Sequence, residues 1–509
     1  MADFQNPPLE DMVALGAVQP TGVRLWLRSR HPGTLRIQWW RQDGKGGPGE
    51  TMVEASGDVR RDGTLSLTLP PPEDPPLEPQ RHYRFRVTRL ADDKVIGEGR
   101  FQTAPGSPEA TPPKFSIALY SCHQPFDKRG AVRQEARQML AALGRCLEDH
   151  DTRLVLEVGD QMYSDLPGPL SLFDDKHFPT VAPPGTRQLL DCSAEQVRRL
   201  YQNRYRYFWN VPGWPEIHTD YPCYPILDDH DIVDNWGSDP AHKEPRWQAF
   251  FKGVRLAYRD YQGSRVLADD EARERSLYYD IIYGHTSVFV MDLRSERRAG
   301  EEGRLYSDQQ ERALGEFLVA NRHQQVLLLV LSVPIIHLSR TLARLVSKLP
   351  PQGEDFSDRW SSGPHLRDRD RMLRMLREHQ HHCPRQKLIL LSGDIHIGCL
   401  HRMCWNDGDP VFYQLVSSPI THHNSWWIQW ASKWLIRMNR RFATWDGKLG
   451  AQVELLPGVG RQDKNPYGGL NFGMLEVETP PDGSVPTIRF LLYGHKGDEP
   501  VCVYRSPEL

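Results

Sequence analysis

The sequence predicts an α/β protein preceded by a smaller β-sandwich. Two patterns carry this prediction. In the first part of the chain, apolar and polar residues alternate along short segments, as in antiparallel strands with one buried face. Further along, apolar runs alternate with a helical repeat, and strand, helix, strand is the pattern of a parallel crossover unit. The length of 509 residues also favours more than one domain.

The amino-terminal part is predicted to be an antiparallel β-sandwich of the immunoglobulin or fibronectin type. Turn-forming clusters at 44–49 and 70–76 separate its alternating segments. We predict the sandwich over 1–103, a Pro- and Ser-rich linker over 104–114, and a catalytic domain over 115–509. The alternating apolar positions are Val23, Leu25 and Leu27; Leu35, Ile37 and Trp39; Leu65, Leu67 and Leu69; and Tyr83, Phe85 and Val87.

Several apolar runs of the second domain end in residues that bind metal ions. The clearest run is 154–158, which Gly159 ends and which is followed by Asp160 and Tyr163. In open α/β sheets, ligands bind just past the carboxyl ends of the strands. One such ending is unremarkable, but several indicate a shared ion-binding rim. The other endings are Cys122 and His123 after 115–121, Asp228 to Asp231 after 224–227, Asp292 and Arg294 after 286–291, and Asp394 and His396 after 387–391.

Helical spacing predicts helices at 131–147 and 367–381, and a capping box predicts another that begins after Ser307. The Arg-rich run 367–377 is interpreted as a solvated helix face, and the aromatic segment 201–214 as core. The segment Trp426 to Phe442 is amphipathic, basic and rich in tryptophan. Such helices can lie on membranes, but we favour a helix packed over the sheet or the site.

Composition excludes several classes of protein. The net charge of −3 gives no general argument for nucleic-acid binding. The longest apolar stretch, 326–336, is too short to span a bilayer, and no secretory signal is visible at the start. Eight cysteines without a Cys-x-x-Cys pair do not suggest a disulfide scaffold. A cytoplasmic location follows as an expectation, while the oligomeric state stays open.

The ordered motifs resemble the PhoD-like (alkaline phosphatase D) family of calcineurin-like metallophosphatases. They are Ser121-Cys122, Gly159-Asp160-x-x-Tyr163, Asp228-Asp229-His230-Asp231, Asp292-x-Arg294 and Ser392-Gly393-Asp394-x-His396. The stretch from Gly16 to Arg28 is similar to the β-sandwich that precedes the catalytic domain in that family. The resemblance implies an αββα metallophosphatase sandwich, a two-metal site and a small phosphate ester as substrate.

The resemblance also implies the metal ligands. Asp160 would bridge two cations; Cys122, Tyr163 and His396 would complete one position, and Asp229 and Asp394 would hold the other. Thiolate and phenolate donors suit Fe(III), and the carboxylate-rich position suits a hard divalent ion, Ca²⁺ first. The five acidic groups of this set would carry a formal charge of about −5, which requires compensating cations.

The expected reaction is in-line attack on phosphorus by a metal-bound hydroxide. His230 would protonate the leaving oxygen or stabilise the transition state, with Asp231 or Asp228 orienting it. Arg294 would either grip phosphate oxygens or form a salt bridge with Asp292. Asn235 and Trp236 are further candidates for the substrate rim.

The sequence also departs from the family pattern. No twin-arginine signal is present, and the segment around Ser332 lacks the metal-binding histidine of other metallophosphatases. His337 is the nearest histidine; His422 and His423 could substitute, although we favour exposed loop positions for both. Two alternative functions therefore remain open. One is a catalytically inactive scaffold or binding protein, and the other is a phospholipid head-group hydrolase that touches the membrane through Trp426 to Phe442.

Overall fold

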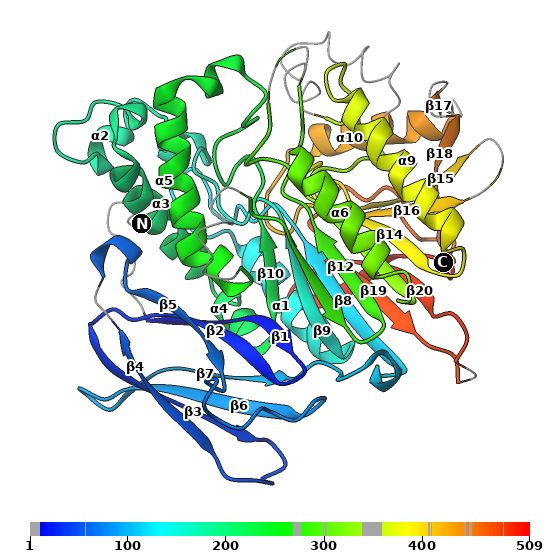
Figure 1. Ribbon diagram of the computed structural model, residues 1–509. Coiled ribbons are helices and arrows are strands. Elements are labelled where there is room, and N and C mark those ends of the chain that lie inside the picture. The colour runs from blue at the N-terminus through cyan, green and yellow to red at the C-terminus, as the bar shows by residue number, and fades with distance from the viewer. Residues whose placement is uncertain are drawn as a thin grey trace.

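The computed structural model describes residues 11–55, 58–267, 276–298, 300, 303–337, 359–405, 408, 410–441, 444–446, 450–481 and 483–509, without the side chains at 428 and 438–446. Its strands form four sheets, two small and two large (Figure 1).

The two small sheets are built from the amino-terminal strands and are antiparallel throughout. Alternate residues of these strands, such as Leu25, Leu27 and Ile37, are buried between the sheets, as the alternation predicts. One sheet has the order β1 (Met12–Gln19), β2 (Gly22–Arg28), β5 (Thr64–Leu69). The other has the order β4 (Gly49–Ala55), β3 (Gly33–Arg41), β6 (His82–Arg89), β7 (Lys94–Gln102).

The first large sheet has six strands. Its parallel strands β8, β9 and β10 adjoin an antiparallel trio from the carboxyl-terminal part of the chain. The order is β10 (Cys223–Ile226), β9 (Thr152–Val158), β8 (Lys114–Tyr120), β19 (Phe472–Glu478), β20 (Thr487–Lys496), β21 (Glu499–Arg505).

The second large sheet has eight strands, and its middle four, β12, β13, β14 and β16, are parallel. The order is β11 (Tyr279–Tyr283), β12 (Thr286–Val290), β13 (Val326–Leu331), β14 (Lys387–Ser392), β16 (Val411–Val416), β15 (Cys399–Trp405), β18 (Ala451–Leu455), β17 (Thr444–Asp446).

The large sheets pack face to face, and helices cover their outer faces. In β13, Val326, Leu328 and Val330 join the core between the sheets, whereas Leu327, Leu329 and Leu331 join the core beneath the helices. Helices α6 (Asp308–Ala320) and α9 (Leu366–His382) cover this side, and α1 (Gln134–Asp149) covers the six-stranded sheet (Figure 1). The predicted αββα sandwich is therefore confirmed.

The other helices among the described residues lie at one side of the sheets or above them (Figure 1). They are α2 (Phe178–Val181), α3 (Ala194–Trp209), α4 (Trp214–Asp220), α5 (Pro245–Tyr261) and α10 (Trp426–Arg441). Short 3₁₀ helices are η1 (Val59–Arg61), η2 (Pro108–Ala110), η3 (Gly168–Leu170), η4 (Leu189–Asp191), η5 (Pro240–Lys243) and η6 (Gly263–Arg265). The aromatic side chains of α3 are buried, as expected.

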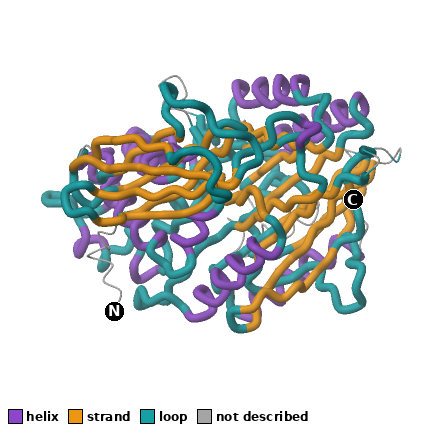
Figure 2. Tube along the Cα trace, turned by 90° about the horizontal axis from the view of Figure 1, so that it is seen from below, coloured by secondary structure: helices purple, strands orange, loops and turns teal. Residues whose placement is uncertain are grey.

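Trp26 of β2 helps to join the small sandwich to the larger part of the protein. Trp26 is fully buried, and its ring lies 5.1 Å from that of Trp209 and 5.5 Å from that of Tyr261. Its indole Nε1 donates to the backbone oxygen of Asp260 at 2.6 Å. Figure 2 shows the strands of the small sandwich beside the helices of the larger part.

The structure corrects the interpretation of the Arg-rich run as a solvated face. Asp368 and Arg369 are buried there, and Asp368 accepts a hydrogen bond from the Leu305 backbone at 2.8 Å and pairs with Arg304. The expectation that the tryptophan-rich segment packs over the sheet is confirmed for α10, whose Ile436 packs against the eight-stranded sheet, while Trp426, Trp427, Trp430 and Trp434 point into solvent. No helix among the described residues is long and apolar enough to cross a bilayer.

Candidate metal centre and active site

The carboxyl ends of the parallel strands in both sheets meet at one edge, where tight turns bring them together. At Gly393, a Cβ atom would lie 2.5 Å from the side chain of Ser121 and from the Val158 carbonyl. At Gly159, whose φ is +87°, it would lie 2.7 Å from the Cβ of Asp228. Glycine is therefore required at both turns, since a side chain at Gly393 would push the two sheets apart and one at Gly159 would displace the neighbouring turn that carries Asp228.

Four carboxylates converge at this edge. One oxygen each from Asp160, Asp228, Asp229 and Asp394 lies within 4.8 Å of the others. Asp160 Oδ2 accepts hydrogen bonds from Cys122 Sγ and from the Tyr163 hydroxyl, both at 3.3 Å. The sequence-predicted residues Cys122, Asp160, Tyr163, Asp229 and Asp394 therefore lie together, although they come from four separate strand ends.

The electrostatics of this cluster oppose ionisation of its acidic groups. Burial, and then the neighbouring carboxylate of Asp229, raises the pKa of Asp160 well above its usual range. Burial and the charge of Asp160 also raise the pKa of the Cys122 thiol and the Tyr163 phenol. In the absence of cations, these groups hold their protons.

The backbone is strained at the same edge. Nine non-glycine residues with positive φ occur in the described part of the chain, and five of them are predicted site residues. Positive φ is costly for residues with a side chain and persists where the surrounding structure imposes it. The five residues are Cys122 (59°), Asp160 (54°), Asn235 (57°), Asp394 (66°) and His396 (52°).

Two histidines adjoin the carboxylates. The rings of His396 and His422 lie 4.1 Å apart, and the ring of His422 lies 5.5 Å from that of Tyr163. Burial lowers the pKa of His396 to about 3, which keeps the imidazole neutral, as metal binding requires. The prediction of an exposed loop position is wrong for His422, which the preceding strand end aims into the site, whereas His423 is exposed.

His230 lies over the Tyr163 ring at 4.4 Å, and one of its nitrogens lies within 4.8 Å of carboxylate oxygens of Asp160 and Asp229. Its Nδ1 contacts both carboxylate oxygens of Asp165 at 2.9 Å. The orienting carboxylate is therefore Asp165, and the expectation that Asp231 or Asp228 orients His230 is wrong. Asp165 stands two residues after Tyr163, in the loop that also carries Asp160, which is the only sequence signal for it.

Asp231 instead ties two loops together. Its carboxylate accepts backbone N–H groups of Asp160 at 2.9 Å, Met162 at 3.0 Å and Asp228 at 2.9 Å. These bonds hold the turn that carries Asp160 against the turn that carries Asp229. Asp231 thus positions the two loops that carry candidate ligands.

Arg294 does not present a free fork to substrate. It is fully buried, with its guanidinium against Asp228 and, at 3.4 Å, against Asp229. The Arg294 backbone N–H donates to Asp292 at 3.0 Å, and its guanidinium is held by Asp228 and Asp229 instead of forming the expected salt bridge with Asp292. Of the two rim candidates, Trp236 is buried and packs 4.9 Å from Phe251, whereas Asn235 is half-buried and its backbone N–H donates to Asp229 at 2.9 Å.

Residues that the sequence did not reveal complete the surroundings. Ser418 Oγ donates to Cys122 Sγ at 3.1 Å and accepts the His396 N–H at 3.2 Å. Ser332 donates to Asp228 at 3.0 Å, and Arg359 pairs with Asp394. His337 belongs to none of the ligand clusters among the described residues.

The donor set fits two cations. Asp160 Oδ1 is buried and accepts no hydrogen bond from the described residues, so it has a lone pair available for a metal. Arg294 pairs with Asp228 and Asp229, and Arg359 pairs with Asp394, so guanidinium groups accompany three of the four clustered carboxylates. Carboxylates, a thiol, a phenol and imidazoles in one pocket match both harder and softer metal ions.

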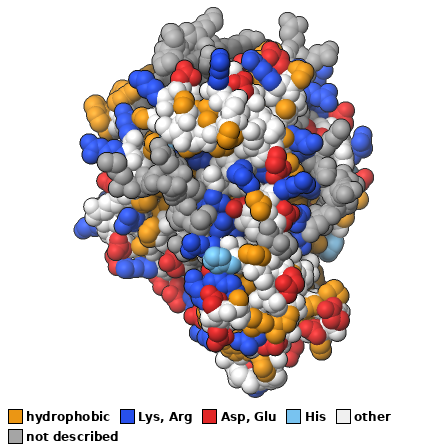
Figure 3. Space-filling model, turned by 90° about the vertical axis from the view of Figure 1, so that its left-hand side faces the viewer, with side chains coloured by type: hydrophobic (Ala, Val, Ile, Leu, Met, Phe, Trp, Pro, Cys, Tyr) orange, Lys and Arg blue, Asp and Glu red, His pale blue; other side chains and the backbone are white. Residues whose placement is uncertain are grey.

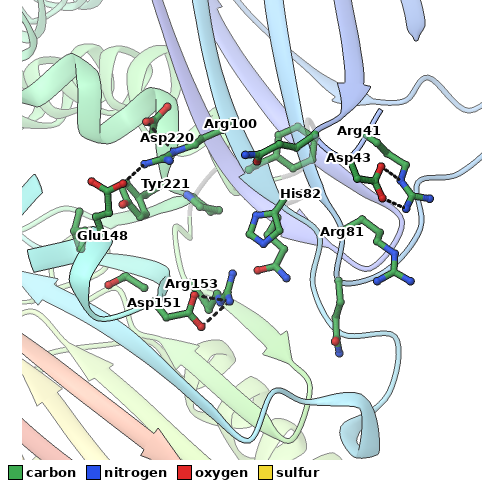
Figure 4. Close-up of a pocket in the computed structure, with 17 residues that line it drawn as sticks. Arg41, Asp43, Arg81, His82, Arg100, Glu148, Asp151, Arg153, Asp220 and Tyr221 are labelled. Carbon is green, nitrogen blue, oxygen red and sulfur yellow. Dashed lines mark hydrogen bonds and ion pairs between the residues drawn. The ribbon is translucent and has the colours of Figure 1, made fainter. Parts of the chain in front are cut away.

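Two other polar places are less suited to a catalytic metal site. Glu157, His218 and Cys223 form a cluster, but Arg265 binds Glu157 at 2.7 Å and takes the place of a metal ion. A cavity of about 550 Å³ between the two sandwiches lies at the opposite ends of β9 and β10. Its arginines face carboxylates, Arg41 to Asp43, Arg100 to Asp220 and Arg153 to Asp151 (Figure 4). Figure 3 shows basic and acidic side chains interspersed on one outer face as well.

The model of the family described as PhoD-like phosphatase matches residues 117–433, more than half of the chain. The chain belongs to the PhoD-like phosphatase family. The match covers every predicted ligand from Cys122 to His396 and extends into α10.

Comparison with solved structures shows which known folds this chain resembles. The chain is similar to a protein described as "Structure of PhoD", with a TM-score of 0.64 and 15% identity over 97% of this chain and 91% of that one. A β-glucuronidase of Bacteroides uniformis matches with a TM-score of only 0.25 and 10% identity, over 77% of this chain and 41% of that one. No curated protein matches the sequence.

Proposed function

We propose that this protein hydrolyses phosphate esters, monoesters or diesters, with the help of two bound metal ions. The observation that supports this most directly is the cluster of four carboxylates with a thiol, a phenol and imidazoles at the carboxyl ends of both sheets. Membership of a phosphatase family supports the same reaction class.

Asp160, Cys122, Tyr163, His396, Asp229 and Asp394 would hold the ions, and His422 lies where it would add a further imidazole. We propose Fe(III) beside the thiol and phenol and a divalent ion, Ca²⁺ first, among the carboxylates. When bound, the ions supply positive charge to the phosphoryl oxygens and lower the pKa of water.

His230 is the proposed proton donor. Burial lowers the pKa of its imidazole, but Asp165 and then the carboxylates of Asp229 and Asp160 outweigh burial and raise it well above its usual value. Nδ1 of the ring is fixed by the Asp165 carboxylate, which favours the protonated form that a proton donor needs. As the bond from phosphorus to the leaving oxygen breaks, that oxygen takes a proton from His230, and water supplies the new oxygen on phosphorus.

Arg294 has a structural part in this proposal. It neutralises Asp228 and Asp229 from the protein side, which keeps those carboxylates close together. The cost of assembling four carboxylates is thereby shared between buried guanidinium groups and the bound ions.

The test is hydrolysis of bis-p-nitrophenyl phosphate and p-nitrophenyl phosphate, with metals quantified in the same preparation. We compare the wild type with Asp160→Asn and with the control Asp498→Asn, which alters an exposed carboxylate in the turn between β20 and β21. The proposal expects activity at least about a thousandfold lower in Asp160→Asn and unchanged activity in the control.

The inactive scaffold is the opposing outcome of this experiment. A wild type that holds both metals and cleaves neither ester would overturn the proposal. Activity that survives Asp160→Asn at the wild-type level would also do so, because it would come from another site.

A further inference from the structure

We propose that the outer face of α10 docks on membranes that carry anionic phospholipids. The face consists of Trp426, Trp427, Trp430 and Trp434, whose residues are 80%, 51%, 60% and 52% exposed. With about 100° between successive residues of a helix, all four fall within an arc of about 100°. They form one surface, which we call the Trp face; Trp430 and Trp434 stack at 6.5 Å.

The side of α10 that faces the protein already packs against other residues of the chain. Ile436 is 2% exposed and packs with Cys399, Val416 and Leu455. Gln429 and Lys433 lie against Gly468, whose added Cβ would be 3.4 Å from the first side chain and 3.3 Å from the second. The Trp face is therefore not the side through which α10 packs on the sheet, since another side of the helix already makes that contact.

The choice of tryptophan and the charge of the helix favour a lipid surface. Indole combines a large apolar ring with a polar N–H and gathers at the boundary between lipid headgroups and acyl chains. The helix contains Lys433, Arg437, Arg440 and Arg441 and no acidic residue. By helical spacing, Arg437 falls on the same arc as the tryptophans. Its guanidinium could therefore bind a headgroup phosphate while the indole rings insert into the membrane surface.

Docking here would bring the candidate metal centre close to the lipid surface. His422, which touches His396 in the site, stands only four residues before Trp426. Docking itself does not depend on the proposed hydrolysis, so the two can be tested separately.

The experiment is co-sedimentation of the full chain with vesicles of phosphatidylcholine alone and with vesicles that also contain phosphatidylglycerol in equal amount. We expect the wild type to bind the mixed vesicles and salt to weaken this binding. The variant Trp427→Ala/Trp430→Ala should bind them at least about tenfold more weakly. Arg437→Glu should reduce binding to the mixed vesicles only. The control is Ile282→Ala/Val319→Ala, which removes exposed apolar side chains elsewhere.

The result also separates docking from catalysis. Hydrolysis of the soluble chromogenic esters should be the same in the wild type and in the double tryptophan variant. Absence of vesicle binding by the wild type, or equal binding by the double tryptophan variant, would overturn the proposal. So would a wild-type dimer in size-exclusion chromatography that this variant abolishes without any loss of vesicle binding, since the face would then join two copies.

Discussion

At the scale of single residues, Asp160 stabilises the metal-bound state at the expense of the metal-free one. In the metal-free folded protein, the pKa of Asp160 is raised above its value in the unfolded chain. The contribution of Asp160 to stability is therefore fully present below the pKa of the unfolded state. It is lost as the pH rises through the pKa of the folded state. At neutral pH the fold is therefore weakened at this position unless cations are bound.

We predict that Asp160→Asn raises the melting temperature of the chelated protein, by about 2 °C or more, because asparagine is uncharged beside Asp229 without having to take up a proton on folding. Differential scanning calorimetry at pH 7.5 with a chelator measures this. In metal-loaded protein the order should reverse, because the variant binds metal more weakly. A lower melting temperature of the variant under chelation would contradict this account.

Asp165 is a positioning residue, and its role separates proton donation from metal binding. Asp165→Asn should reduce kcat about ten- to hundredfold, with metal content unchanged, because His230 loses the carboxylate on its Nδ1. The matched control is Asp234→Asn, since Asp234 lies 3.9 Å from the other nitrogen and should matter less.

His230→Ala completes that test. Because a nitrogen of His230 lies near Asp160 and Asp229, the same side chain could instead bind a metal. Lower turnover with intact metal content supports a proton donor, and loss of both would identify His230 as a ligand.

At the scale of elements, the ends of strands explain which site residues the sequence could predict. Asp160, Asp229 and Asp394 each lie within three residues of the end of an apolar run, and parallel strands bring their carboxyl ends to one edge. This topological rule needs no knowledge of side-chain contacts. It therefore located the candidate ligands but not the residues that they contact.

The errors concern contacts between segments far apart in the chain. Arg294 was expected at the substrate or on Asp292, but its guanidinium reaches Asp228, 66 residues away in sequence. Trp236 was expected at the rim because it follows a site motif, yet α5 covers it. No local pattern encodes such distant partners, since burial at these positions depends on how separate elements pack.

The contact between β2 and helices α3 and α5 yields a prediction about how the parts of the chain unfold. Trp26→Ala should destabilise the protein by about 3–5 kcal/mol, because it leaves a cavity beside Trp209 and Tyr261. It also removes the hydrogen bond that the indole donates to the Asp260 backbone oxygen. Chemical denaturation measures the loss, and Trp40→Ala, at a partly exposed ring of β3, serves as control. Equal losses of unfolding free energy in the two variants would show that the contacts of Trp26 with α3 and α5 do not stabilise the protein more than an ordinary partly exposed tryptophan does.

At the scale of the whole molecule, the buried ion cluster around Glu157 makes stability depend on pH. Burial alone raises the pKa of Glu157, but Arg265 and then His218 outweigh it and bring the pKa to about 2. Because the folded pKa is lowered, the stabilisation is present above the unfolded value near 4.5 and is lost as the pH falls toward 2.

Glu157→Gln should therefore be less stable than the wild type at pH 7, and the difference should shrink between pH 4.5 and 2 by on the order of 3 kcal/mol. Denaturation curves of both proteins across this range measure the difference. Glu98→Gln, an exposed change on β7, is the control. A difference that does not vary with pH would contradict the assignment of charge to Glu157.

The pairing of β8 with β19 has a consequence for synthesis on the ribosome. Ala118 pairs with Met474, so the strand that delivers Cys122 has one neighbour early and the other only after most of the chain has been made. Until then β8 presents an open edge, which invites pairing with other chains. Production of the protein should therefore be sensitive to the rate of translation and to chaperones that shield strand edges, more than the stability of the finished fold would suggest.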